Sequence, residues 1–481
     1  MLLKRFYDES LAQASYLVGS TNTGDAVIID PNRDVEQYVQ AAAFHHQRIT
    51  HVAETHIHAD FVSGARALAA RTGARLVLSG EGGPDWQYGF AEGDGALVVR
   101  DGDSMLAGDI RLDVIATPGH TPEHVSFTVT DTASANRPMG IFTGDFLFVG
   151  DVGRPDLLER AAGVANSMEG AARQLYRSLQ KMRAHEDFLQ LWPGHGAGSA
   201  CGKSLGAVPS STLGYERRFN WAFSVHEEDE FVRMVLEGQP EPPAYFAEMK
   251  RINRDGPPVN DGAASEMRRL DAAALQALLQ RGTEGPLVVD TRAPREFASS
   301  FVRGTINIPA GKSFTTWAGS LLPYDRDIAL LIDGDDDVHA RALARALSLV
   351  GLDRVTAWGG RALREEWQRA GHPLAQIPTI ESTAVGTRPD LFVIDVRGDA
   401  EWQAGHIPGA KHLFLGTLIE RSGRLPRNLP IVVHCQGGTR SSIAASLLHA
   451  NGFTEVINLP GGFAEWKAAG LPVETEDPGK A

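Results

Sequence analysis

Short apolar runs alternate with longer amphipathic stretches along most of the chain. A short apolar run bounded by turn residues predicts a strand, and apolar positions spaced three and four apart predict a helix. Alternation of the two is typical of an α/β protein. The predicted strands include residues 26–29, 49–54, 75–78, 110–115 and 431–433, and the predicted helices include residues 34–46, 63–72 and 441–450.

Two turn-rich segments divide the chain. The first, residues 254–264, is rich in Gly, Pro, Asn and Asp, and the second, residues 372–378, contains two prolines. Such segments favour linkers over helices or strands. They predict three domains, at residues 1–255, 265–375 and 379–476.

The second and third predicted domains are diverged copies of one unit. The sequence LVVDTR at residues 287–292 matches FVIDVR at 392–397, and both copies carry a Gly-Gly pair shortly before a tryptophan. In each copy, apolar runs are followed by helical patterns. Each copy is therefore predicted to form a parallel α/β sheet with helices on both faces.

Composition and charge narrow the class of protein. The chain is 43% hydrophobic and 22% charged, as in an ordinary globular protein, and its net charge is −14. An acidic surface disfavours nucleic acid, because that affinity depends on Lys and Arg neutralising phosphates. No apolar run approaches the roughly 20 residues needed to span a bilayer, and the N-terminal residues do not resemble a signal peptide. We expect a cytoplasmic protein with no nucleic-acid or membrane partner.

The cysteines are too few for a disulfide framework. The chain has two, Cys201 and Cys435. In a reducing compartment both are candidates for chemistry.

Histidines and aspartates follow predicted strands at four separate turns. Imidazole and carboxylate groups crowded at strand ends are the ligands that metal binding requires. Any single turn of this kind is a weak signal, but the four together predict a metal site. The residues concerned are His56, His58, Asp60, His120, Asp145 and His195.

This arrangement resembles the metallo-β-lactamase superfamily over about residues 1–250. The resemblance implies an αββα sandwich with metals at one edge of its sheets. Dinuclear hydrolases of that superfamily carry His-x-His-x-Asp-His, whereas this chain has Phe61 in the last position. Two histidines and one carboxylate with open positions suit a mononuclear non-haem Fe(II) that activates O2. Phe61 therefore favours one iron over two zinc ions.

The detailed motifs resemble the persulfide dioxygenase branch of that superfamily. They are ETHIHAD at residues 54–60, TPGHTPE at 117–123 and GRPD at 153–156. The resemblance implies one Fe(II) per chain bound by His56, His120 and Asp145. It implies that the neighbouring groups His58, Asp60 and His195 orient ligands or water, with coordination by His58 left open. Members of the branch are usually oligomers, so a homo-oligomer is expected.

Further residues of this region are candidates for other roles. Arg217 lies in a segment that resembles the one supplying an arginine to the substrate pocket, and Tyr215 is next to it. A surface arginine is the alternative for Arg217.

Cys201 follows His195 in a Gly/Ser-rich loop and is a candidate for carrying sulfur, with a buried structural thiol as the alternative. Arg154 and Asp156 are expected to form an internal salt bridge.

The third domain contains a loop suited to sulfur transfer. Cys435 lies between a predicted strand and helix in the sequence HCQGGTRS. A Gly-rich turn before a helix aims backbone N–H groups at one point, and Arg440 adds a positive charge, so the thiolate of Cys435 is favoured. The region resembles a rhodanese domain over about residues 380–473. The resemblance implies Cys435 as the nucleophile that carries sulfur.

The middle domain lacks this chemistry. An alignment of the two copies without a gap places Gly334 opposite Cys435 and His339 opposite Arg440, and residues 265–375 contain no cysteine. The loop instead carries successive aspartates, which would repel an anionic persulfide. We interpret it as a degenerate rhodanese-like domain.

Three functions fit these observations. The first is a fused persulfide dioxygenase and thiosulfate sulfurtransferase in sulfide detoxification. Its partners would be O2, sulfite or thiosulfate, and the persulfide of glutathione, coenzyme A or bacillithiol. The second is a glyoxalase II-like thioester hydrolase, which Phe61 disfavours. The third is a non-catalytic sulfide-responsive binding protein.

Overall fold

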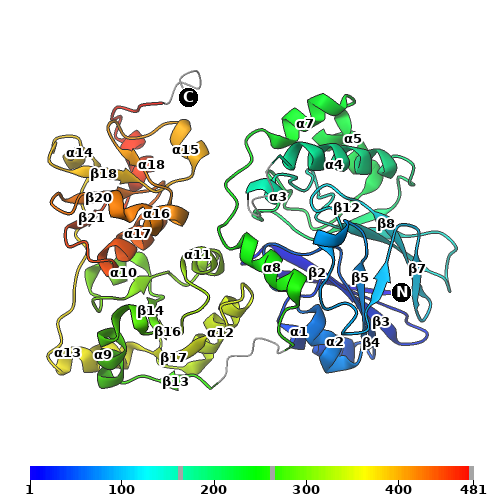
Figure 1. The fold of residues 1–481 in the computed structure, drawn as a ribbon, viewed down its shortest axis with the longest axis horizontal. Helices are drawn as coiled ribbons and strands as arrows, with labels where there is room; N and C mark the ends of the chain where they lie inside the picture. Colours follow the sequence, from blue (N-terminus) through cyan, green and yellow to red (C-terminus); the bar gives the residue numbers. More distant parts are fainter. Residues whose placement is uncertain (161–165, 260–265, 476–481) are drawn as a thin grey trace. The chain divides into compact units, whose positions relative to one another are not determined.

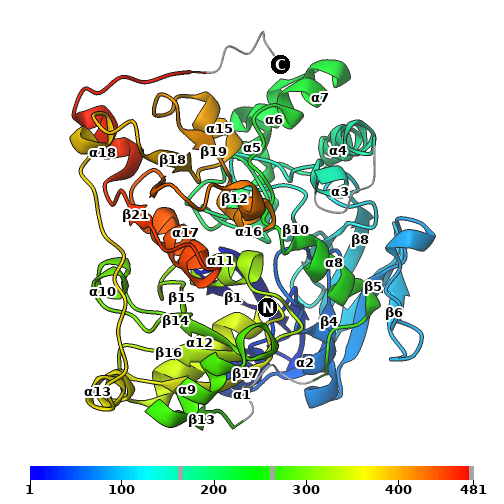
Figure 2. The same ribbon diagram turned by 60° about the vertical axis from the view of Figure 1, so that its left-hand side comes forward.

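The protein divides into two units, each with its own sheets (Figures 1 and 2). This computed structural model describes residues 1–160, 166–259 and 266–475. The first unit comprises residues 1–263 with 347–351, and the second comprises residues 264–346 with 352–481. In the described part of the chain, no helix combines the length and apolar character needed to cross a membrane.

The first unit contains two sheets of six strands each. One sheet has the order β1-β2-β3-β4-β5-β6 and the other has the order β12-β11-β10-β9-β8-β7. The strands of the first sheet are β1 (Leu2–Asp8), β2 (Gln13–Gly19), β3 (Asp25–Ile29), β4 (Arg48–Ala53), β5 (Arg75–Ser79) and β6 (Leu97–Val99). Those of the second are β7 (Ser104–Ala107), β8 (Ile110–Ala116), β9 (Val125–Asp131), β10 (Gly140–Gly144), β11 (Gln190–Pro193) and β12 (Ser211–Thr212).

Alternating side chains along the strands build the layers of this unit. In β3, Val27 and Ile29 pack in the core between the two sheets, whereas Ala26 and Ile28 pack under α1 (Val35–Phe44) and α2 (Ala65–Thr72). Successive residues of a strand point to opposite faces, so one strand serves both cores. In β10, Phe142 belongs to the core between the sheets, and the outer face packs on α4 (Met168–Met182). The predicted αββα sandwich is confirmed.

The helices cover the two outer faces of the sandwich. Figure 1 shows α1 and α2 on one side of the strands and α4, α5 and α7 on the other. The helices of this unit are α1 (Val35–Phe44), α2 (Ala65–Thr72), the 3-10 helix η1 (Pro84–Trp86), α3 (Leu157–Arg160), α4 (Met168–Met182), α5 (Leu213–Phe219), α6 (Trp221–Ser224), α7 (Glu228–Leu236) and α8 (Phe246–Asp255).

The second unit contains two parallel sheets with the same strand order. The first sheet has the order β13-β17-β16-β14-β15, and the second has the order β21-β20-β18-β19. The four strands of the second sheet correspond in order to β17, β16, β14 and β15 of the first. The strands are β13 (Arg268–Arg269), β14 (Leu287–Asp290), β15 (Ile306–Asn307), β16 (Ile328–Leu331), β17 (Val355–Gly359), β18 (Phe392–Asp395), β19 (Lys411–His412), β20 (Ile431–His434) and β21 (Val456–Asn458). The predicted parallel sheets are confirmed.

Helices flank both of these sheets. Those of the first copy are α9 (Ala272–Gln280), η2 (Gly282–Glu284), α10 (Pro294–Ser299), α11 (Phe314–Leu321), α12 (Asp337–Ser348) and α13 (Arg361–Arg369). Those of the second are α14 (Ser382–Val385), α15 (Asp399–Gln403), η3 (Leu415–Thr417), α16 (Leu418–Arg421), η4 (Ser422–Arg424), α17 (Thr439–Ala450) and α18 (Gly462–Ala468).

The strand register corrects one detail of the predicted repeat. Asp290 pairs with Leu331 between β14 and β16, and Asp395 pairs with His434 between β18 and β20. The residue after Leu331 therefore corresponds to Cys435, so Ile332 and not Gly334 occupies the cysteine position. The alignment was wrong because the first copy has two more residues between its strand end and the glycine after the helix, one before α12 and one after it. An ungapped alignment from that glycine cannot show them.

Candidate metal centre and cysteine loop

The predicted metal ligands lie where four strands of the first unit end. His56 follows β4, His120 follows β8, Asp145 follows β10 and His195 follows β11. One ligand atom from each of His56, His120 and Asp145 lies within 4.8 Å of the others, and all three side chains are buried. The Nε2 atom of His120 is 3.5 Å from Asp145 Oδ2, and that of His56 is 3.9 Å from it.

The atoms that face this centre have no hydrogen-bond partner in the described chain. They are Nε2 of His56, Nε2 of His120 and both carboxylate oxygens of Asp145. Buried polar atoms are rarely left without partners, because each costs about 1–3 kcal/mol of desolvation. Two bare imidazole nitrogens and a carboxylate form a donor set that suits a divalent metal. The residues therefore fit the metal that the sequence predicts.

Hydrogen bonds on the opposite ring nitrogens fix the imidazole protons. His120 Nδ1 donates to the carbonyl oxygen of Arg154 at 3.1 Å. His56 Nδ1 lies 2.9 Å from Thr55 Oγ1, and the Thr55 hydroxyl donates its own hydrogen to Asp30. The proton of the His56–Thr55 contact must therefore come from the imidazole. Both rings then keep a lone pair on Nε2, which is the form that binds a metal.

Burial and neighbouring groups keep these imidazoles neutral. Burial lowers the pKa of His56 well below its ordinary value, and the imidazoles of His58, His124, His120 and His195 lower it further. Burial also lowers the pKa of His120, although the Asp145 carboxylate opposes the effect. Neutral imidazole binds a metal without first losing a proton.

A glycine makes the close approach of the Asp145 loop possible. A Cβ atom on Gly153 would overlap the carbonyl oxygen of Asp145. The N–H of Gly153 donates to the carbonyl of Phe146 at 3.2 Å. The next residue, Arg154, forms a buried ion pair with Asp156 at 2.7 Å, which confirms the predicted salt bridge.

His58 and Phe61 lie beside the centre. His58 Nε2 is 3.2 Å from Asp30 Oδ1, and its Nδ1 has no partner among the described residues. The ring of Phe61 is fully buried and 4.4 Å from the ring of His58. An aromatic side chain thus fills the position where the dinuclear hydrolases have a histidine.

Asp60 and His195 meet beside Cys201. His195 Nε2 lies 3.1 Å from Asp60 Oδ2 and 3.5 Å from Asp145 Oδ2. Cys201 is buried next to them, with its sulfur within 4.8 Å of both ligand atoms. Burial raises the pKa of the Cys201 thiol, and the carboxylates of Asp60 and Asp145 raise it further. This environment disfavours a free thiolate at Cys201.

The structure does not join Arg217 and Tyr215 to the metal centre. Arg217 donates to the carbonyls of Arg183 and His185 and forms an ion pair with Asp187 at 2.6 Å. Tyr215 is 56% exposed. A role for either residue in substrate binding stays a prediction.

Three residues that support the centre were missed from the sequence. His124 Nε2 accepts the N–H of Asp145 at 3.1 Å. Asp30 accepts hydrogen bonds from both the N–H and the hydroxyl of Thr55. Glu216, next to Arg217, accepts the N–H of Gly150 at 2.8 Å. Asp30 directly follows a predicted strand, as the predicted ligands do, so a signal for it was present.

The cysteine loop of the second unit connects β20 to α17. Cys435 is buried, and its sulfur accepts the N–H of Gly438 at 3.1 Å. Gly438 has a φ of +103°, and a Cβ there would overlap the carbonyl oxygen of Pro460. Only glycine suits this turn, which aims a backbone N–H at the sulfur.

Two ion pairs lie next to the loop. Arg397 forms a buried ion pair with Asp395 at 2.6 Å and donates to Gln436 Oε1 at 3.3 Å. Arg440 forms two bonds with Glu401, at 2.5 and 2.8 Å. Arg440 therefore stands at the start of α17 with a carboxylate partner of its own.

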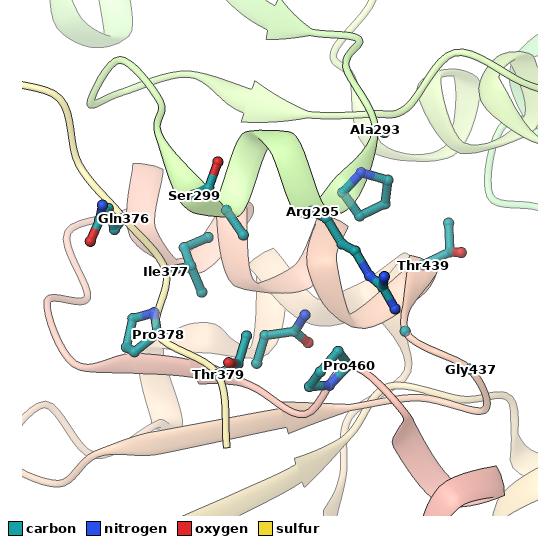
Figure 3. A pocket seen from close by; sticks show the side chains of 14 residues that line it. Ala293, Arg295, Ser299, Gln376, Ile377, Pro378, Thr379, Gly437, Thr439 and Pro460 are labelled. Atoms are coloured by element: carbon teal, nitrogen blue, oxygen red, sulfur yellow. The ribbon is translucent and has the colours of Figure 1, made fainter. Parts of the chain in front are cut away.

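A cleft of about 1010 Å³ opens beside this loop, between the two copies of the second unit. Gly437, Gly438 and Thr439 line one side of it, and α10 lines the other. Figure 3 shows the Arg295 side chain extending from α10 toward Gly437 and Thr439. The cleft thus offers a guanidinium group opposite the N-terminus of α17.

The corresponding loop of the first copy has a structural role. Asp335 accepts the N–H of Ala362, and Asp336 accepts the N–H of His339 at the start of α12. Asp333 lies 3.4 Å from Arg361. These carboxylates are used as helix caps and ion pairs, and no cysteine is present.

Comparisons with known proteins separate the chain into the same two parts. A model of the metallo-beta-lactamase superfamily matches residues 10–195, and a model of the rhodanese-like domain matches residues 383–469. A solved structure of a metallo-beta-lactamase from Staphylococcus aureus is 40% identical, with a TM-score of 0.66 over 75% of this chain and 99% of that chain. The chain belongs to the metallo-beta-lactamase superfamily.

Two relatives of the first unit differ in the activity that their names give. The mitochondrial persulfide dioxygenase ETHE1 of Bos taurus is 28% identical over 240 residues, which is 49% of this chain and 80% of that protein. Hydroxyacylglutathione hydrolase of Rhodospirillum rubrum is 31% identical over 186 residues, 37% of this chain and 60% of that protein. The resemblance to persulfide dioxygenases with a rhodanese-like domain is confirmed.

Proposed function

We propose that this protein oxidises thiol persulfides with O2 and transfers sulfane sulfur through Cys435. One observation carries the proposal. The bare Nε2 atoms of His56 and His120 meet the unpartnered carboxylate of Asp145, while Phe61 fills the place of a further imidazole. Such a set with open positions is typical of mononuclear Fe(II) sites that activate O2.

The chain's own residues hold and orient the metal ligands. His56, His120 and Asp145 would hold one Fe(II), which supplies the redox chemistry needed to activate O2. Thr55 and the carbonyl of Arg154 keep the imidazole protons on Nδ1. Burial excludes bulk water from the ligand atoms, and this strengthens the electrostatic contacts among them.

The overall reaction of the first unit balances with one water. A persulfide R–S–SH, O2 and H2O give the thiol R–SH, sulfite and two protons. The terminal sulfur loses four electrons, and O2 takes them up. The carrier thiol R–SH would be glutathione, coenzyme A or bacillithiol, in a cytoplasm that keeps such thiols reduced.

Cys435 would connect sulfite with thiosulfate. In one direction the persulfide Cys435–S–S⁻ gives its outer sulfur to sulfite, forming thiosulfate and leaving the Cys435 thiolate. In the other direction thiosulfate loads the cysteine. Covalent storage on sulfur splits the transfer into two easier steps. The cleft with Arg295 offers a positive charge to either anion.

The test is O2 uptake by iron-loaded protein given glutathione persulfide, with coenzyme A persulfide as a second substrate. We expect uptake with sulfite as product in the wild type and none in His56→Ala. A matched control is His226→Ala, which changes a histidine outside the ligand set. Absence of uptake in a sample of verified iron content contradicts the dioxygenase.

A thioester hydrolase is the second candidate, because a relative is named hydroxyacylglutathione hydrolase. The two candidates differ in their requirements. Release of glutathione from S-lactoylglutathione by zinc-loaded protein without O2 supports the hydrolase. O2-dependent sulfite formation by the iron-loaded protein supports the dioxygenase.

A further inference from the structure

The cleft beside the Cys435 loop has a charge pattern that favours an anionic ligand. Arg295 is the one charged side chain among the 14 described residues that line it, and none of them is a carboxylate. The whole chain, by contrast, has more acidic than basic residues, 60 against 46. We propose that this cleft binds the anionic carrier portion of a thiol persulfide and that Arg295 selects such donors for Cys435. The inference rests on the proposed sulfur transfer and gives a role to the copy without a cysteine.

The guanidinium group of Arg295 is available to a ligand. It is exposed and forms no ion pair or hydrogen bond within the part of the chain that the structure describes. Figure 3 shows it extending from α10 toward Gly437 and Thr439, at the start of α17. A helix of 12 residues presents unpaired N–H groups and a partial positive charge at its start. Two positive groups that face each other without a counter-charge favour an anion between them.

The internal repeat shows that the fold does not require this arginine. The sequences DTRAPRE at residues 290–296 and DVRGDAE at 395–401 align without a gap, and their first residues hold the same strand position. Ala400 of the copy with the cysteine therefore corresponds to Arg295. An arginine is thus present only on the copy whose helix α10 faces the cleft, which is the placement that a ligand contact needs.

Asn458 gives an independent indication of a ligand. It ends β21, lines the cleft and is 5% exposed. Its Oδ1 atom is buried and has no hydrogen-bond partner in the described ranges, whereas buried polar atoms rarely lack one. The backbone of Asn458 is fixed by bonds to Pro378 and Ile380, at 2.9 and 3.1 Å. A ligand that donates a hydrogen bond, such as an amide N–H, would satisfy this oxygen.

The size of the cleft suits an organic ligand. Its volume of about 1010 Å³ lies at the upper end of the range for small-molecule sites, roughly 300–1,000 Å³. Thiosulfate and sulfite are far smaller, and neither has an N–H group for Asn458. An anionic group and an N–H donor occur together in glutathione, coenzyme A and bacillithiol. The cleft also offers such a carrier apolar contact surface, from Pro294, Ala298, Ile377, Pro378 and Pro460.

Gly438 connects the cleft with the reacting sulfur. It lines the cleft, and its N–H donates to Cys435 Sγ at 3.1 Å. In the transfer, the Cys435 thiolate attacks the outer sulfur of the persulfide R–S–SH. A new S–S bond to Cys435 forms while the S–S bond of the donor breaks, and the carrier sulfur leaves with the electron pair and takes the proton. The products are R–SH and Cys435–S–S⁻, so no oxidant or reductant is needed.

Loading of Cys435 in the absence of O2 tests the proposal. Iron-loaded, full-length protein is mixed with the persulfide of glutathione, coenzyme A or bacillithiol, or with thiosulfate, and mass spectrometry follows the Cys435 persulfide. Arg295→Ala should raise the half-saturating concentration of an organic persulfide at least about tenfold and keep the rate at saturation within about twofold, because only binding is lost. With thiosulfate the change should stay below about threefold, since Arg295 then acts only through its charge. The carrier affected most identifies the anionic group, a carboxylate or a phosphate.

Control variants separate this contact from general effects. Arg295→Lys keeps the charge without the planar fork and should recover part of the affinity. Arg303→Ala removes an exposed arginine of the same copy outside the cleft and should leave all four donors unchanged. Unchanged half-saturating concentrations of the organic persulfides in Arg295→Ala overturn the inference, while Cys435 remains the sulfur carrier. An equal loss with thiosulfate overturns it in favour of a site for inorganic anions. Absence of loading from any donor in the wild type overturns the proposed sulfur transfer as well.

Discussion

Arg440 is bound by Glu401 through two hydrogen bonds, although it stands at the helix start beside the Cys435 loop. The two bonds measure 2.5 and 2.8 Å. Both side chains are partly buried, at 22% and 38% exposure. Paired charges of this kind offset each other, so removal of one partner leaves the other uncompensated. Loss of either partner would therefore leave a net charge close to the Cys435 loop.

The first prediction concerns this pair. Arg440→Ala should slow the loading of Cys435 with sulfur from thiosulfate by about tenfold or more, because the uncompensated Glu401 carboxylate repels the anion. It should also reduce the free energy of unfolding by about 1 kcal/mol. The double variant with Glu401→Gln should recover part of the rate. The measurement is the loading rate in a double-mutant cycle at low salt. A double variant as slow as Arg440→Ala contradicts this explanation.

The second prediction separates the two proposed activities. Cys435→Ser should lower sulfur transfer from thiosulfate by at least about a hundredfold, since an alcohol does not carry sulfane sulfur. O2 uptake with supplied glutathione persulfide should stay within about twofold of the wild-type value, because Cys435 lies outside the metal centre. Both rates are measured on the same iron-loaded preparation. A large loss of O2 uptake would instead mean that sulfur must pass through Cys435 first.

The grouping of the candidate metal ligands was predictable, because each stands within four residues of the end of a strand. His56 follows β4 of one sheet, whereas His120 and Asp145 follow β8 and β10 of the other, so the packing of the two sheets brings the three residues together at one edge. The hydrogen bonds that orient them were not predictable. His120 is held by the carbonyl of Arg154, 34 residues away along the chain. A backbone carbonyl leaves no residue-type signal in a sequence.

The contacts of Arg217 could not be read from its motif. Its segment suggests a substrate-facing arginine, which stays a prediction, and the structure shows its guanidinium bound to Asp187 and to two carbonyls of the same loop. That loop is about 30 residues distant, and its approach depends on how α4 and α5 pack. The repeat gives a similar case. The identity of the Cys435 counterpart depended on two extra residues in the first copy, one before α12 and one after it.

The third prediction tests the backbone of the Asp145 loop. Gly153→Ala should reduce metal affinity by about 10–100-fold, because the added Cβ overlaps the Asp145 carbonyl and moves the ligand. The strain should also destabilise the protein by about 1–3 kcal/mol. Metal content after dialysis and the unfolding midpoint in urea are the two measurements.

Gly170→Ala is the matched control for this substitution. Gly170 lies in α4 with nothing within 4 Å of an added Cβ. Alanine there should stabilise the helix by about 0.5–1 kcal/mol and leave metal content unchanged. Equal metal loss in both variants would show that the effect is not specific to the Asp145 loop.

The fourth prediction concerns the pH dependence of stability in the metal-free protein. Burial raises the pKa of Glu123 to about 7, although hydrogen bonds from Ile57 and Thr121 oppose the shift. The pKa in the folded state is thus above that in the unfolded state. The folded protein binds the extra proton between about pH 4.5 and 7, so this contribution to stability is present at acid pH and is lost as pH rises through 7.

Glu123→Gln isolates that contribution. The glutamine oxygen can still accept the N–H of Ile57, but the side chain no longer ionises. Relative to the variant, the wild type should lose on the order of 2–3 kcal/mol of unfolding free energy between pH 5 and pH 8. Glu54, whose pKa burial also raises to about 7, remains in both proteins and contributes equally to each. Urea unfolding of chelator-treated protein at several pH values gives the difference. Parallel stability curves for the two proteins would show that Glu123 does not change its protonation in this range.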